Sequence, residues 1–179
     1  MKTRKIVKKT GAATMRALPK IDRNGNKTIL VVDNKPFYVL GAEVQNSSAS
    51  CLTFMEPIWK RLADLHCNTV LAPVYWELLE PVEGTFDFTL VKGLLEGARA
   101  HGLRLILLWF GTWKNGDSCY APAWVKQDLK RFPRAQSTPG KNARNISPFS
   151  RACRDADARA FVHLMRFLKR QDRQHTVIM

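Results

Sequence analysis

Short apolar runs recur about every 33 residues in this chain, and this repeat limits its possible folds more than any other feature. The runs at 37–41, 70–74 and 103–109 lack polar alternation, which is typical of strands buried on both faces of a parallel sheet. Pro73 is expected to mark the end of the second run. Because helical patterns separate the runs, the repeat predicts a parallel sheet with right-handed crossovers and an α/β fold.

End signals support the helices of this repeat. The first helix has apolar residues at helical spacing, a capping box at Thr53 and Glu56, and Pro57 in its first turn. The second is predicted from about residue 89 to residue 101, with Gly102 as its stop signal. Each helix is expected to cover one face of the sheet.

The segments outside this repeat are less regular. Residues 28–32 are predicted to open a small β-hairpin whose turn lies at 33–35. Farther along, 131–150 is punctuated by proline and glycine and is predicted to be irregular, whereas 155–169 forms an amphipathic helix. Residues 176–179 are predicted to begin a fourth strand.

The length of the chain suits half of a known architecture. An eight-stranded βα barrel takes about 250 residues, whereas this chain has 179. We therefore expect a partial (βα)8 TIM barrel, with about the first four βα units, an N-terminal β-hairpin and a truncation at strand four. Residues 1–20 would form a disordered basic tail and residues 21–179 the half-barrel domain. A transit peptide or an incorrectly chosen start codon is an alternative for the tail.

The net charge of +14 is concentrated at the two ends of the sequence. Residues 1–20 hold seven basic and no acidic residues, and 126–179 hold thirteen basic against four acidic residues. Nucleic-acid binding through phosphate contacts is one interpretation of the basic run 144–173. Because Arg159 and Arg166 lie on the solvated face of a predicted helix, we expect no nucleic-acid partner. No stretch approaches the ~20 apolar residues that span a bilayer, so no membrane partner is expected either.

The cysteines and histidines predict no metal site and no cofactor. No C-x-x-C pair is present, and the histidines complete no metal-ligand spacing. Isolated cysteines fit reduced thiols in a cytoplasmic protein better than a disulfide framework, although two bridges remain open. The N-terminus lacks the apolar region of a signal peptide, which also favours a cytoplasmic location. The cysteines are Cys51, Cys67, Cys119 and Cys153.

Polar and aromatic residues cluster where each predicted strand ends, and enzymes built on parallel strands keep their chemistry there. Aromatic faces stack on the apolar face of a sugar ring, while carboxylates, amides and lysine hydrogen-bond its hydroxyls. The composition therefore predicts a carbohydrate pocket, with core packing as the alternative for any one tryptophan. The candidate substrate-binding residues are Glu43, Gln45, Asn46, Tyr75, Trp76, Glu77, Trp109, Trp113, Lys114 and Asn115.

Four segments in order resemble the β-galactosidase-like enzymes of glycoside hydrolase family 35, with family 42 sharing the pattern of the second segment. They are FYVLGAEVQNSS at 37–48, NTVLAPVYWELLEPVEGTFDF at 68–88, GLRLILLWFGTWKNG at 102–116 and YAPAWVK at 120–126. The resemblance implies a retaining glycosidase of the βα-barrel class that acts on β-galactosides or related sugars without a cofactor. Departures from the family pattern at 73–77 and 113–116 leave the galactose specificity open.

The resemblance also implies where the catalytic groups lie. The acid/base Glu would follow strand four and the nucleophile Glu would lie on strand seven, both beyond Met179, so we assign no catalytic residue and expect an inactive chain. Glu80, Pro81 and Gly84 predict a structural turn in preference to a catalytic group. Two alternatives stay open: a non-catalytic carbohydrate-binding half-barrel that pairs with another chain, and a basic nucleic-acid-binding protein. The oligomeric state is not predicted.

Overall fold

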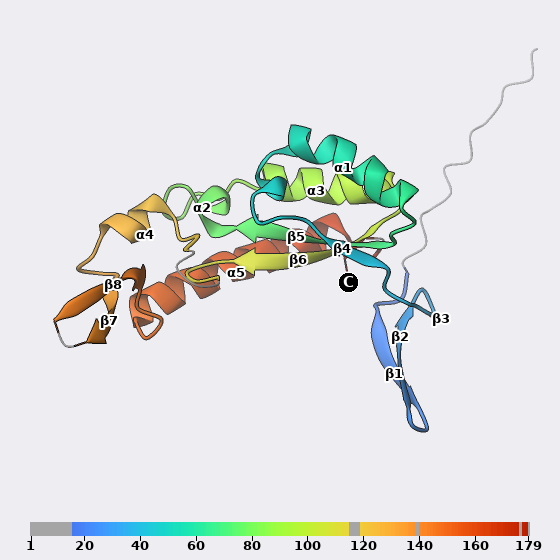
Figure 1. Cartoon of the computed structure of the whole chain (residues 1–179), viewed down its shortest axis with the longest axis horizontal. Coiled ribbons are helices and arrows are strands. Elements are labelled where there is room, and N and C mark those ends of the chain that lie inside the picture. Colours follow the sequence, from blue (N-terminus) through green and yellow to red (C-terminus); the bar gives the residue numbers. More distant parts are fainter. Residues whose placement is uncertain (1–15, 115–118, 139, 176, 179) are drawn as a thin grey trace, which may run out of the picture.

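The computed structural model describes residues 16–114, 119–138, 140–175 and 177–178. Most of the predicted basic tail therefore lies outside the described residues. Two hairpins project from opposite ends of a central layered part, in which helices cover a parallel sheet (Figure 1). The mixed α/β class predicted from the repeat is confirmed.

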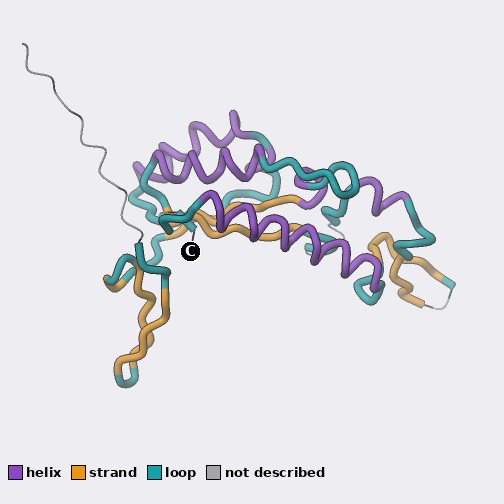
Figure 2. The backbone as a smooth tube through the Cα atoms, turned by 180° about the vertical axis from the view of Figure 1, so that it is seen from behind, coloured by secondary structure: helices purple, strands orange, loops and turns teal. Residues whose placement is uncertain are grey.

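Three parallel strands form the centre of the molecule, in the order β4, β5, β6. They are β4 (Gly41–Glu43), β5 (Thr69–Tyr75) and β6 (Arg104–Phe110). In register, Thr69 pairs with Gly41 on one side and with Arg104 on the other. The helices α1 (Leu52–Asp64) and α3 (Thr89–Ala100) lie side by side over one face, while α5 (Arg151–Gln171) runs along β6 (Figures 1 and 2).

Of the fourth strand predicted at 176–179, residues 176 and 179 lie outside the described residues, and the other two form an isolated bridge beside β6. Ile178 forms a parallel bridge with Leu105, and the Leu105 N–H donates to the Val177 carbonyl at 2.9 Å. Asp172, at the end of α5, fixes this segment by accepting from the N–H groups of Val177 at 3.1 Å and Ile178 at 2.9 Å. The segment is therefore positioned by a helix end and a strand edge together.

The N-terminal hairpin differs from its predicted extent. β1 (Lys20–Asn24) pairs with β2 (Lys27–Val32), and β2 pairs with the two-residue strand β3 (Lys35–Pro36). The turn at residues 33–34 has φ values of 51° and 62°, the left-handed conformation that aspartate and asparagine tolerate. The prediction of a strand over 37–41 was wrong, because residues 37–40 connect the hairpin to β4.

Pro73 lies inside β5, and the prediction that it ends the strand was also wrong. On the β4 side, the ladder finishes where Glu43 pairs with Leu71. Beyond that pair, β5 has no β4 residue opposite it, so the N–H that proline lacks costs no ladder hydrogen bond on that side. The neighbouring strand, which sequence periodicity cannot show, decides whether a proline is tolerated.

The first helix begins one residue before the predicted capping box. Cys51 occupies the N-cap of α1 and makes no side-chain cap hydrogen bond, so Thr53 lies within the first turn and Pro57 inside the helix. The predicted capping box was therefore wrong. The end of α3 agrees with prediction, because Gly102 follows it with φ of 67°.

The segment 131–150, predicted to be irregular, contains a second hairpin of β7 (Arg134–Thr138) and β8 (Lys141–Ile146). It is followed by α5, which is longer at both ends than predicted. The Ser150 hydroxyl caps α5 by accepting from the Cys153 N–H at 3.3 Å.

Two apolar clusters form the core. The first joins the parallel sheet to helices α1 and α3 and to the second half of α5, and includes Val70, Leu94 and Leu164. The second joins α2 (Trp76–Leu79), α4 (Ala123–Gln127), β8 and α5, with Trp76 and Phe132 fully buried in it. The second cluster therefore fixes the loops that follow the carboxyl ends of β5 and β6.

Candidate functional site

The carboxyl ends of the three parallel strands lie at one edge of the sheet. Tyr75 and Phe110 end β5 and β6 and pair directly in register, whereas β4 ends earlier, where Glu43 pairs with Leu71. This stagger leaves room above β4, into which its following loop extends. Such an edge is where enzymes of parallel βα architecture place their chemistry.

An aromatic cluster closes this edge. The rings of Tyr75 and Phe110 meet edge to face with centroids 5.7 Å apart, and the Tyr120 ring lies 4.8 Å from Phe110. The Tyr120 N–H donates to the Gly111 carbonyl at 3.1 Å, which ties the later loop to the end of β6. Lys114 places Nζ 4.5 Å from the Phe110 ring centroid, a cation–π contact.

Tyr75 carries a buried hydroxyl in this cluster. Burial raises its pKa to about 12, and the nearby Tyr120 adds to the shift. The hydroxyl approaches the backbone N–H groups of Ala49 and Ser50 without closing a hydrogen bond of good geometry to any described residue. The phenol therefore stays protonated at neutral pH and keeps hydrogen-bonding capacity.

Glu77 follows β5 and is anchored from α4. Its carboxylate accepts from Lys126 Nζ at 2.7 Å, and its N–H donates to the Tyr120 carbonyl at 2.9 Å. The carboxylate is partly exposed, so one oxygen remains accessible beside the aromatic cluster. This is the arrangement of a group that can hydrogen-bond a hydroxyl while its charge is balanced.

Trp76 lies in the second core cluster instead of at the surface. Its side chain is fully buried and its Nε1 donates to Glu80 Oε2 at 2.8 Å. The Glu80 carboxylate is also fully buried; its Oε1 accepts from the Gly84 N–H at 2.8 Å and from Arg159 at 2.9 Å. Trp76 therefore packs in the core, which was the alternative interpretation for any one tryptophan. The structural turn predicted at Glu80 is confirmed.

Asp157 organises the loop after β6. Its carboxylate accepts from Trp109 Nε1 at 2.7 Å, from the Thr112 N–H at 2.8 Å and from the Thr112 hydroxyl at 2.6 Å. A Cβ on Gly111 would lie 2.5 Å from Asp157 Oδ2, so the carboxylate reaches the loop only because this position is glycine. Asp157 thus positions Trp109 and leaves no oxygen free for catalysis.

A cavity of about 520 Å³ adjoins this loop, between the end of β6 and the first half of α5. Trp113, with 57% of its surface exposed, lies on its wall with Trp109 and Phe161. The rings of Trp109 and Phe161 meet edge to face with centroids 5.8 Å apart. Three aromatic side chains therefore lie on the wall of this cavity, together with two charged residues, Arg154 and Asp157.

The structure separates the predicted residues that it describes into four groups. Glu43, Gln45 and Asn46 are exposed above β4. Tyr75, Glu77 and Lys114 meet at the aromatic cluster, whereas Trp109 and Trp113 face the neighbouring cavity and Trp76 is in the core. Asn115 lies outside the described residues. Their role in substrate binding remains a prediction.

Sequence reasoning missed Phe110, Tyr120, Lys126 and Asp157. Phe110 could have been found, because the paired strands end one residue later than the predicted run 103–109. Lys126 and Asp157 lie 49 and 48 residues from their partners Glu77 and Trp109, and no local pattern joins positions so far apart. All four cysteines are unpaired, and no group of three metal-ligating side chains occurs among the described residues.

Comparison with known proteins points to one class of enzyme. Residues 53–138 match the model of glycoside hydrolase family 42, described as beta-galactosidase. The chain is similar to glycoside hydrolases. A beta-galactosidase of Xanthomonas manihotis is 33% identical over 121 residues, which cover 64% of this chain and 19% of that protein. The chain thus spans about a fifth of that relative. The matched model is that of family 42, whereas the motifs predicted family 35.

Solved structures share the fold. An exo-beta-1,4-mannosidase from Opitutaceae bacterium strain TAV5 superposes with a TM-score of 0.59 at 20% identity, over 83% of this chain and 25% of that one. The catalytic domain of a beta-amylase from Paenibacillus polymyxa gives 0.60 at 14% identity, over 77% and 35%. At these identities the likeness concerns the fold alone, which is that of TIM-barrel glycosidases.

Proposed function

We propose that this chain forms the amino-terminal part of a (βα)8 barrel in a β-galactosidase-like glycoside hydrolase, and that it supplies sugar-binding side chains. One observation carries this proposal: the family match spans β5 and β6, whose carboxyl ends hold the aromatic cluster with Glu77 and Lys114 beside it. Tyr75 and Phe110 are 4% and 1% exposed, so the partly exposed Tyr120 is the ring of this cluster on which a sugar would stack, beside groups that hydrogen-bond hydroxyls.

The proposed reaction of the complete barrel is hydrolysis with retention, which needs two carboxyl groups about 5–5.5 Å apart. Among the described carboxylates at this edge, Glu43 is exposed, whereas the other three are engaged with donors, so no two of them are free to act as a catalytic pair. Glu77 pairs with Lys126, Glu80 is buried among three donors, and Asp157 accepts three hydrogen bonds. We therefore propose that the acid/base and the nucleophile come from other parts of the barrel, and that this chain binds sugar without turning it over.

The finer family assignment rests on the sequence motifs. Family 35 is proposed from the four segments between 37 and 126, while the matched model is that of family 42. Both proposals predict a β-galactoside or a related sugar. The same proposal divides the chain into a tail at 1–20 and the barrel part at 21–179.

The test is sugar binding by the purified chain. Galactose, mannose and glucose are titrated while tryptophan fluorescence or heat is followed, and an aryl β-galactoside is supplied in parallel to measure hydrolysis. Glu77→Gln keeps the shape of the side chain but removes its charge, and should weaken binding about fivefold, the equivalent of one hydrogen bond. Glu56→Gln, on the exposed side of α1, is the matched control and should change nothing.

Three outcomes would contradict the proposal. Hydrolysis at rates typical of glycosidases would show that this chain carries its own catalytic pair. Absence of binding to any of the three sugars at tens of millimolar would remove the sugar site itself. Equal weakening in Glu77→Gln and Glu56→Gln would place the binding elsewhere.

A second candidate is a non-catalytic carbohydrate-binding half-barrel that pairs with another chain. Apolar side chains on the two sides of the sheet favour it: Tyr38 and Leu40, next to β4, are 83% and 52% exposed, and Phe161 on α5 is 40% exposed. Exposed apolar surface beside open strand edges marks an interaction site. Sedimentation of the purified chain distinguishes a dimer with sugar affinity from a monomer.

A further inference from the structure

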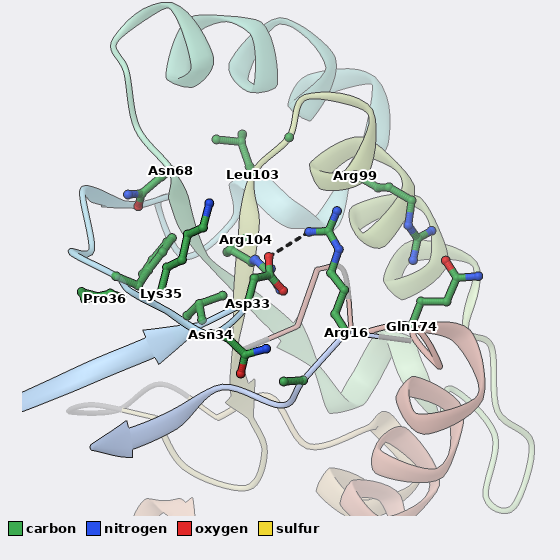
Figure 3. Close-up of a pocket in the computed structure, with 14 residues that line it drawn as sticks. Arg16, Asp33, Asn34, Lys35, Pro36, Asn68, Arg99, Leu103, Arg104 and Gln174 are labelled. Carbon is green, nitrogen blue, oxygen red and sulfur yellow. Dashed lines mark hydrogen bonds and ion pairs between the residues drawn. The ribbon is translucent and has the colours of Figure 1, made fainter. Parts of the chain in front are cut away.

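The amino ends of the parallel strands face a cavity of about 880 Å³, at the opposite end of the sheet from the proposed sugar site (Figure 3). Four basic side chains line it from four separate segments, whereas Asp33 is the one acidic residue on its wall among the described residues. The basic residues are Arg16, Lys35, Arg99 and Arg104.

Asp33 does not neutralise this cavity. Its Oδ2 is shared by Arg104 at 2.7 Å and Arg16 at 2.9 Å, so one carboxylate faces two guanidinium groups. Arg104 is nearly buried and also donates to the His175 carbonyl at 2.9 Å, which makes it part of the cavity floor. Lys35 forms no ion pair with any described residue, so positive charge remains on the wall.

A second cavity, of about 480 Å³, lies at the end of α5. All its lining residues are basic or histidine: Arg166, Lys169 and Arg170 lie on one face of α5 at i, i+3, i+4 spacing, and Arg173 follows in the turn after the helix. None of the four forms an ion pair with any described residue. Like charges at this spacing repel one another, so the face is suited to an external anion. The lining residues are Arg166, Lys169, Arg170, Arg173 and His175.

The two cavities adjoin along one short segment. Gln174 lines the first cavity, while its neighbours Arg173 and His175 line the second. The Gln174 carbonyl accepts from the Arg16 N–H at 3.2 Å, and the His175 carbonyl accepts from Arg104. Basic side chains therefore follow one another from the N-terminal hairpin across the strand ends to the last turns of α5, and the acidic residues among them are Asp33 and Asp172, which pairs with Arg99 at 3.4 Å.

We propose that these two cavities form a binding surface for the phosphodiester backbone of a nucleic-acid strand. Six of the eight Arg and Lys residues are arginines, whose planar fork matches phosphate oxygens. Charges spread over two adjoining cavities fit a polymer with phosphates at intervals, whereas a single phosphate would occupy one cavity. The walls are concave, which fits a strand better than a flat bilayer. The surface goes beyond the proposed glycosidase function, and it reverses the expectation from the sequence that the chain has no nucleic-acid partner.

The experiment measures binding of the full chain to a fluorescently labelled 20-nucleotide single-stranded RNA as NaCl is varied. The variant combines Arg166→Gln, Arg170→Gln and Arg173→Gln. Each lost phosphate contact lowers the slope of log K against log[salt] by about 0.7, so we expect the slope to fall by about 2 and the affinity to fall at least tenfold. The matched control, Lys60→Gln with Arg61→Gln and Lys92→Gln, removes the same charge from α1 and α3 and should retain both values.

Additional variants and ligands test which part of the chain binds RNA. A chain with Lys2, Lys5 and Lys8 changed to Gln tests the basic N-terminus; loss of RNA binding there, with full binding in the α5 variant, would overturn the proposal. Equal losses in the α5 variant and its matched control would also overturn it, because net charge alone would then explain binding. Anionic lipid vesicles that bind the chain while RNA does not would assign the surface to a membrane. Sugar titrations on the α5 variant should be unchanged, so failure here is distinct from failure of the sugar site.

Discussion

The two ends of the same three strands differ in how their charges are balanced. At the carboxyl end, Glu80 and Asp157 each accept three hydrogen bonds, and Glu77 is matched by Lys126. At the amino end, one carboxylate, Asp33, is shared by two arginines, and a basic helix face adjoins it. The carboxyl end is therefore aromatic, with its buried carboxylate fully hydrogen-bonded, whereas the amino end retains excess positive charge.

This difference separates positions that hold the fold from positions that are available to ligands. A buried carboxylate must be fully hydrogen-bonded because an uncompensated charge is costly in the interior. An exposed basic group carries no such requirement, since water and salt screen it. Charge removal should therefore affect folding at the carboxyl end, and binding more than folding on the exposed basic face.

The largest expected effect is at Glu80. Glu80→Ala leaves Trp76 Nε1, the Gly84 N–H and Arg159 without their acceptor, so we expect the free energy of unfolding to fall by about 3–5 kcal/mol. Urea denaturation followed by tryptophan fluorescence measures it. Glu83→Ala, three positions away and partly exposed, should cost less than about 1 kcal/mol. Similar losses in both variants would break the distinction between a buried and an exposed carboxylate.

At the amino end, Arg104 differs from the exposed basic residues because its side chain is buried. Arg104→Ala removes donors to Asp33 and to the His175 carbonyl, and should lower the free energy of unfolding by about 2 kcal/mol. Arg16→Ala removes the more exposed partner of the same carboxylate and should cost less than about 1 kcal/mol. Thermal denaturation of both variants in one buffer compares them, and a larger cost for Arg16→Ala would contradict the assigned burial.

A smaller effect is expected where a backbone approaches a carboxylate. Gly111→Ala places a Cβ 2.5 Å from Asp157 Oδ2 and 2.6 Å from Trp109 Nε1, which should lower the free energy of unfolding by about 1–2 kcal/mol and shift the Trp109 emission. A double-mutant cycle with Asp157→Ala checks the cause, since the part of the clash that involves the carboxylate disappears when that group is gone, while the approach to Trp109 stays. Strict additivity of the two changes would show that they do not act on the same contact.

The smallest effect is a pH dependence at Tyr75. Burial raises its pKa to about 12 from an ordinary value near 10. The folded chain therefore holds the proton between these values while the unfolded chain releases it, so this group lowers stability as pH rises from about 10 to about 12. Ultraviolet titration should show Tyr75→Phe differing from the parent only near pH 12. A difference that appears already at pH 10 would show that the hydroxyl is solvated.

Sequence patterns predicted the secondary-structure elements more accurately than they predicted the contacts between side chains. The helix over 89–101 was predicted to within one residue, because its apolar spacing and Gly102 are local signals. The β7–β8 hairpin was missed, although the Thr138-Pro139-Gly140 sequence is a turn signal, because its strands lack apolar alternation. Trp76 and Trp113 have similar sequence settings after a strand, yet one is buried and the other is 57% exposed.

The sequence by itself determined the βα alternation, the parallel strands and the enrichment of aromatic and polar residues at their carboxyl ends, because periodicity and turn chemistry act between near neighbours. Tertiary structure alone decided which of those residues pack inward. It also decided which distant partners satisfy their carboxylates, as Arg159 does for Glu80 across 79 positions. The same packing brings basic residues from separate segments to one face. Such pairings depend on how helices dock on the sheet, a geometry that no local pattern encodes.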